Sequence, residues 1–105
     1  AILNDKGFTT YHESTDNEAV HHLFVITHKN RDHLSTELSK SGIPTGIHYP
    51  IPIHKHQCFA DCSFTKGKNF PVAEKQADEL LSLPMHPNLS QSEIEFISTK
   101  LIDLM

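Results

Sequence analysis

The sequence predicts an α+β fold, in which a small mixed or antiparallel sheet of three to four strands carries about three helices on one face. Two features support this fold class. Short apolar runs, partly β-branched, alternate with longer segments of helical periodicity, and proline and glycine separate them. The chain of 105 residues is expected to form a single domain, because that length buries roughly two-thirds of the unfolded surface. Residues 1–20 are weakly patterned and are expected to form a junction and a loop.

Four segments are candidate strands. The apolar run from Leu23 to Ile26 lies within residues 22–28 and is typical of a strand that is covered on at least one face and central to a sheet. Residues 81–83 precede Pro84, which favours a short edge strand. Residues 8–11 and 43–48 complete the expected set, and the second of these segments leads into a proline-rich loop.

Three segments are candidate helices. Asn30 is a candidate N-cap and Gly42 a candidate C-terminal glycine, which predicts a helix over residues 31–41. Pro71 suits the first turn of a second helix, and Ser90 with Glu93 forms a capping box that opens a third. The apolar face of the second helix is expected to consist of Val72, Ala73, Ala77, Leu80 and Leu81. The residues expected in the core are Phe70, Val72, Leu80, Leu81, Leu83, Ile94, Ile97 and Leu101.

Composition excludes two classes of partner. A formal net charge of −4 and the lack of a basic stripe argue against nucleic-acid binding. The apolar runs are far shorter than the ~20 residues that a membrane span needs, so no membrane partner is expected. With only two cysteines, Cys58 and Cys62, the chain is compatible with a reducing compartment, and a cytoplasmic protein is expected.

The most informative segment is the run TGIHYPIP at residues 45–52. Pro44, Pro50 and Pro52 fix φ and remove backbone donors, which predicts a stiff loop rather than a helix or central strand. Five side chains capable of hydrogen bonding lie on this loop or directly after it, which indicates a surface that faces a ligand. They are His48, Tyr49, His54, His56 and Gln57.

Two alternative readings of this segment remain open. His54, His56, Cys58 and Cys62 supply imidazole and thiolate groups that suit tetrahedral zinc, although they lack the usual C-x2-C or H-x3–5-H spacing. Alternatively, the chain is a stand-alone α+β module that uses the proline loop as its ligand-binding face.

Several motifs together resemble the C-terminal small domain of the DegT/DnrJ/StrS family of pyridoxal-phosphate-dependent sugar aminotransferases. In chain order they are HLFVI at 22–26, KNRD at 29–32, GIPTGIHYPIPIH at 42–54 with Gln57, and FPVAEKQADELLSLPMHP at 70–87. The resemblance continues into the closing helix and covers roughly four-fifths of the chain.

The resemblance implies that this chain is one domain of a larger transferase. Its partner would be a large domain of the same polypeptide that holds pyridoxal phosphate, and the full-length form would be a homodimer. None of the eight lysines lies in a segment resembling the family's aldimine motif, so the isolated chain is expected to contain no catalytic or cofactor-binding residue and to be inactive. The implied reaction transfers an amino group from an amino acid, commonly glutamate, to a keto group on a nucleotide-linked deoxyhexose, in surface polysaccharide or secondary-metabolite biosynthesis.

The resemblance also singles out substrate-binding residues. In the family, the loop that matches TGIHYP closes one wall of the substrate cleft, near the sugar and its diphosphate. Carried over to this chain, the expected substrate contacts are His48 and Tyr49, followed by His54 and Gln57.

Overall fold

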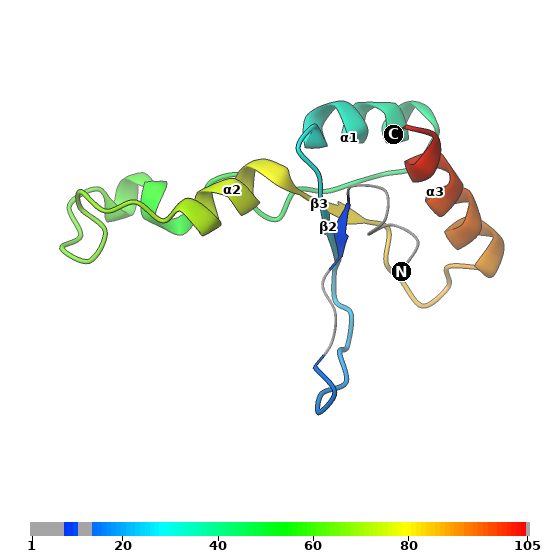
Figure 1. Ribbon diagram of the computed structural model, residues 1–105, viewed down its shortest axis with the longest axis horizontal. Coiled ribbons are helices and arrows are strands. Elements are labelled where there is room, and N and C mark those ends of the chain that lie inside the picture. The colour runs from blue at the N-terminus through cyan, green and yellow to red at the C-terminus, as the bar shows by residue number, and fades with distance from the viewer. Residues whose placement is uncertain (1–7, 11–13, 105) are drawn as a thin grey trace.

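The computed structural model describes residues 8–10 and 14–104, which form a three-stranded sheet, three α-helices and two short 3-10 turns (Figure 1). The elements in chain order are β1 (Thr9–Thr10), β2 (Phe24–Thr27), α1 (Arg31–Lys40), η2 (Ile53–Lys55), η3 (Gln57–Phe59), α2 (Pro71–Glu79), β3 (Leu80–Leu83) and α3 (Gln91–Asp103).

The sheet is antiparallel throughout, in the order β1-β2-β3. β2 is central, as the apolar run at 22–28 predicts, and Ile26 pairs with Leu81 of β3. The expected strand at 81–83 is β3, at one end of this order. β1 covers part of the expected strand at 8–11, of which Tyr11 lies outside the described residues. The α+β fold class is therefore confirmed.

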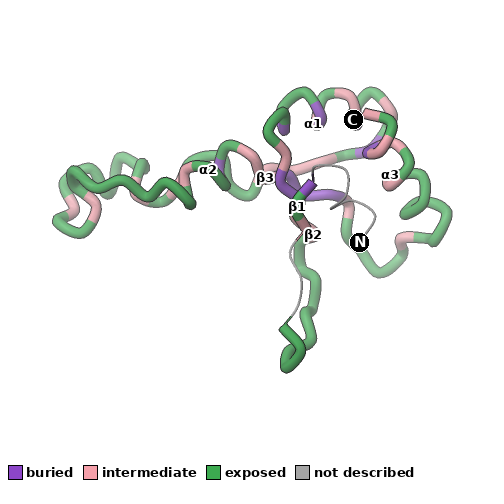
Figure 2. The backbone as a smooth tube through the Cα atoms, viewed as in Figure 1, coloured by how far each residue is buried: buried purple, intermediate pink, exposed green. Residues whose placement is uncertain are grey.

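The core lies where α1, α3 and the sheet meet (Figure 2). Four large side chains are fully buried there: Ile26, Leu38, Leu81 and Leu101. Phe8, Leu34, Ile43 and Leu83 complete the buried cluster. We call the sheet, α1 and α3 together the compact body. Each buried side chain contributes roughly 1.5–3 kcal/mol by leaving water, so the compact body accounts for most of the hydrophobic stabilisation.

The helix boundaries follow local signals. α1 begins after Asn30, whose side chain makes no capping bond, and its C-terminal end is closed by Gly42 in a left-handed conformation at φ 77°. The Ile43 amide then donates to the carbonyl of Leu38 at 2.9 Å, a bond typical of a glycine-terminated helix. At α3, Ser90 and Glu93 form the expected capping box.

The prediction of a strand at residues 43–48 is wrong. Only an isolated bridge forms there, with paired backbone bonds between Gly46 and Ser82 at 3.0 and 2.7 Å. Pro44 has no N–H to donate, and the chain turns into the proline loop soon afterwards, so a longer ladder cannot develop. The bridge nevertheless fixes residue 46 beside β3.

The packing of α2 also differs from expectation. Figure 1 shows α2 extending away from the sheet together with residues 50–70, and we call residues 49–79 the arm. Only Ala77 of α2 is buried, whereas Val72 is 70% exposed. Phe70 and Ile94, which are also expected in the core, are exposed, and so is Ala73 of the expected apolar face. Their helical spacing is real, but the described residues supply too little surface to cover them.

Candidate functional site

His48 is held between β3 and its own loop. Its Nδ1 lies 3.0 Å from the hydroxyl oxygen of Ser82, which is buried in β3. Its ring lies directly over Gly46, where an added Cβ would be 2.6 Å from the His48 Cε1 atom. The Gly46–Ser82 bridge thus brings both supports to one place, and the imidazole has a defined orientation although the residue is exposed.

Tyr49 follows through a cis peptide bond and stands edge-on to the His48 ring, with the two ring centroids 5.6 Å apart. The side chain is 73% exposed. His48 and Tyr49 therefore form a paired polar and aromatic surface where the compact body meets the arm. Both residues stand out in the sequence as candidate substrate contacts.

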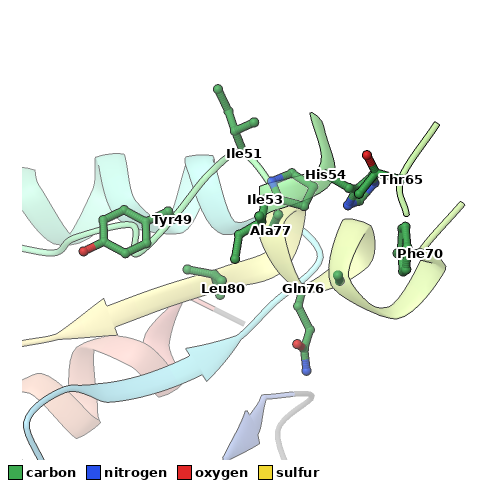
Figure 3. Close-up of a pocket in the computed structure, with 11 residues that line it drawn as sticks. Tyr49, Ile51, Ile53, His54, Thr65, Phe70, Gln76, Ala77 and Leu80 are labelled. Carbon is green, nitrogen blue, oxygen red and sulfur yellow. The ribbon is translucent and has the colours of Figure 1, made fainter. Parts of the chain in front are cut away.

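An open groove of about 440 Å³ begins at Tyr49 and runs along the arm. Figure 3 shows Tyr49 near one end of the groove and Thr65 with Phe70 near the other. One wall comes from the proline loop and the other from α2 and the first residue of β3. The lining is mostly apolar: Tyr49, Ile51, Pro52, Ile53, His54, Thr65, Phe70, Ala73, Gln76, Ala77 and Leu80.

Glu74 of α2 joins the two walls. Its carboxylate accepts hydrogen bonds from His54 Nε2 at 3.0 Å, from Lys55 Nζ at 2.8 Å and from the Phe70 amide at 3.1 Å. The bond from Lys55, followed by those from Phe70 and His54, lowers the pKa of Glu74 to about 2. The carboxylate is therefore ionised at neutral pH.

The remaining loop residues are not gathered into one cluster. The ring of His54 bonds Glu74 and packs against Phe70, with centroids 4.7 Å apart. His56 donates from Nε2 to the Ile51 carbonyl at 3.2 Å, and Gln57 is exposed at the start of η3.

The zinc alternative finds no support in this geometry. Within residues 8–10 and 14–104, no group of three or more His, Cys, Asp or Glu side chains is placed to hold a metal ion. Of the four candidate ligands, His54 and His56 bond to protein oxygens, and Cys58 and Cys62 are free thiols.

The sequence alone does not indicate the roles of Ser82, Glu74 and the α2 wall of the groove. Ser82 reads only as a strand residue, because its role depends on a bridge to residue 46 that no local pattern encodes. Glu74 does carry a signal, since it is the acidic residue in the first turn of α2. Its partners His54 and Lys55, however, lie about twenty residues away in sequence.

Pyridoxal phosphate does not fit the groove. A cofactor of this kind needs a lysine for its Schiff base and a carboxylate toward its ring nitrogen. The groove lining contains neither a lysine nor a carboxylate. Nearby, Lys55 and Glu74 are paired with each other. No step of chemistry through the cofactor is therefore assigned to residues of this chain.

Among the described residues, no helix combines the length and apolarity that crossing a bilayer would require.

The fold and the loop together define a small α+β domain whose projecting arm carries an open groove between the proline loop and α2. Residues 2–102 match the DegT/DnrJ/EryC1/StrS aminotransferase family. The chain belongs to this family.

Named relatives and solved structures agree with this assignment. The chain is 46% identical over 76 residues to the erythromycin biosynthesis sensory transduction protein EryC1 of Saccharopolyspora erythraea, covering 72% of this chain and 20% of the relative. It is 35% identical over 99 residues to the UDP-2-acetamido-2-deoxy-3-oxo-D-glucuronate aminotransferase of Pseudomonas aeruginosa, covering 94% of this chain and 26% of the relative. A crystal structure of a DegT DnrJ EryC1 StrS aminotransferase from Brucella abortus superposes with a TM-score of 0.89 at 29% identity, covering 98% of this chain and 27% of that one. The chain thus spans about a quarter of the length of such proteins.

Proposed function

We propose that residues 1–105 are the C-terminal small domain of a full-length, pyridoxal-phosphate-dependent nucleotide-sugar aminotransferase, with residues 1–20 at the domain junction. Family membership and the share of each relative that the chain spans support this proposal. The enzyme would move an amino group from an amino acid, with glutamate as the expected donor, to a keto group on a nucleotide-linked deoxysugar. One relative is named as the aminotransferase of a UDP-linked 3-oxo sugar, which supports this substrate class.

The observation that carries the proposal is the fixed orientation of His48. Ser82 engages Nδ1 and Gly46 supports the ring, so Nε2 is the nitrogen that remains for a ligand. A pre-oriented imidazole on a stiff loop can hydrogen-bond a sugar hydroxyl or a diphosphate oxygen with little loss of conformational entropy. Tyr49 would stack on or hydrogen-bond the same substrate. These residues bind and orient the sugar and help to exclude water.

His54 and Gln57 have smaller parts in the proposal. His54 already bonds Glu74 through Nε2, so it would contribute mainly through the shape of the groove and its second ring nitrogen. Gln57 is exposed and would reach only an extended substrate such as the nucleotide end.

The cofactor would be held by the large domain of the same polypeptide, where it would supply the electron sink for the transfer. The same domain would cover apolar side chains that the arm exposes, among them Ile53 at 72% and Phe64 at 78%. The full-length protein would be a homodimer. We place it in the cytoplasm, where free thiols such as Cys58 and Cys62 persist.

Replacing His48 by Ala in the full-length enzyme tests the proposal. Loss of a hydrogen bond to a charged ligand group costs about 1.5–3 kcal/mol, which corresponds to roughly ten- to a hundredfold in kcat/KM for the nucleotide sugar. The amino-donor half-reaction should be nearly unchanged, because it does not involve the sugar.

The matched control is His22→Ala, which removes an exposed histidine outside the groove and should leave both half-reactions unchanged. A lower melting temperature with unchanged sugar kinetics in the His48 variant would show that the residue is structural, and would end the case for this loop as the substrate wall.

A further inference from the structure

We propose that Glu74 is a positioning residue for sugar binding: its carboxylate ties η2, which directly follows the proline loop, to α2 and thereby fixes the distance between the two walls of the groove. This inference rests on the proposed function, since it assumes that the groove and the adjoining His48 loop receive the nucleotide sugar.

The first support is the number and origin of its partners. The carboxylate bonds three donors with both of its oxygens: Oε1 accepts from His54 and from the Phe70 amide, and Oε2 accepts from Lys55. His54 and Lys55 belong to η2, whereas Phe70 immediately precedes α2. One side chain therefore connects two segments that are separated by about twenty residues.

The second support is shelter from solvent. The side chains of His54 and Glu74 are only 10% and 26% exposed, and the His54 ring packs on Phe70. A fully exposed ion pair contributes little because water and salt screen it. The His54–Glu74 contact is more sheltered than that, while Lys55, which is half exposed, forms the outer part of the cluster.

The third support is the lack of fully buried side chains in this part of the loop. Neither η2 nor η3 contains a buried residue, and the Gly46–Ser82 bridge holds the start of the loop. The position of Ile51 and Ile53 against Ala73 and Ala77 of α2 therefore depends on the bonds to Glu74, together with the packing of the His54 ring on Phe70.

The experiment compares Glu74→Ala, Glu74→Gln, His54→Ala and the Glu74→Ala/His54→Ala double variant in the full-length enzyme. We expect Glu74→Ala to raise the KM for the nucleotide sugar by about tenfold, because a misplaced wall binds substrate poorly, and to leave the amino-donor half-reaction unchanged. Glu74→Gln should have a smaller effect, because its amide oxygen still accepts a hydrogen bond. The double variant should resemble Glu74→Ala alone, since residues that act through one contact are not additive.

The matched control is Asp78→Ala, which removes an exposed carboxylate one turn further along the same helix and should behave as the wild type. An unchanged sugar KM in Glu74→Ala would overturn the inference, as would equal losses in both half-reactions accompanied by a lower melting temperature. If His48→Ala impairs sugar kinetics while Glu74→Ala does not, the inference fails and the proposed function stands. If neither variant affects them, both fail.

Discussion

At the scale of single residues, the orientation of His48 depends on two neighbours that are not themselves proposed to contact the substrate. Ser82 reaches Nδ1 from β3, and Gly46 leaves open the space that the ring occupies. Any larger residue at position 46 would occupy that space, since its Cβ would lie within 2.6 Å of the ring. The glycine is therefore required by a side-chain contact rather than by an unusual φ.

Replacing Gly46 by Ala should displace the His48 ring and leave the compact body folded. Because a displacement of about 1 Å can cost on the order of a hundredfold in rate, we expect a ten- to hundredfold loss in kcat/KM for the nucleotide sugar. Steady-state kinetics of the full-length enzyme measure this loss.

The control is Gly67→Ala, which adds the same methyl group where nothing lies within 4 Å. Its φ of 72° adds local strain of about 1–2 kcal/mol, but the variant should keep normal sugar kinetics. Normal kinetics in the Gly46 variant as well would contradict the account of His48.

At the scale of elements, Arg31 anchors the root of the arm. Its side chain is buried, and Nη1 donates to the carbonyls of Ala77 and Leu80 at 2.9 and 3.1 Å, where α2 passes into β3. The guanidinium thereby satisfies carbonyl groups that the helix leaves unpaired at its end. Arg31 of α1 thus joins the arm to the sheet and helices, and the bond from the amide of His28, the residue after β2, to the Glu79 carbonyl adds a second link.

Arg31→Ala should lower the free energy of unfolding by about 1–3 kcal/mol, because the carbonyls of Ala77 and Leu80 lose their donor. Denaturant unfolding of the chain measures the change. Lys29→Ala, an exposed substitution two residues earlier, should change the stability by less than about 0.5 kcal/mol. Equal stability of the two variants would show that Arg31 does not anchor the arm.

The same elements show what could be predicted from the sequence. β2 and the capping box of α3 depend on residues close together in the chain, so local patterns identify them. The strand expected at 43–48 fails because Pro44 limits the ladder to a single bridge at Gly46. The residues of the candidate site also differ in this respect. His48 and Tyr49 can be recognised from the sequence, because they lie on the proline loop. Ser82 and Glu74 acquire their roles only through long-range contacts.

At the scale of the whole molecule, the compact body and the projecting arm differ in how far they bury their apolar side chains. The body buries nearly all of the core, while the arm exposes much of its apolar surface (Figure 2). Val72 is exposed because α2 packs on the body only through its C-terminal end, which helical periodicity alone cannot reveal. This exposed apolar surface fits the proposal that a larger domain of the same polypeptide covers the arm.

A crystal structure of the full-length enzyme with bound nucleotide sugar would show whether His48 contacts the substrate. We predict that His48 keeps its bond to Ser82 and that its Nε2 lies within hydrogen-bonding distance, about 2.7–3.2 Å, of the sugar or its diphosphate, with Tyr49 against the same ligand. A ligand that binds elsewhere and leaves residues 48–57 without contact would contradict it.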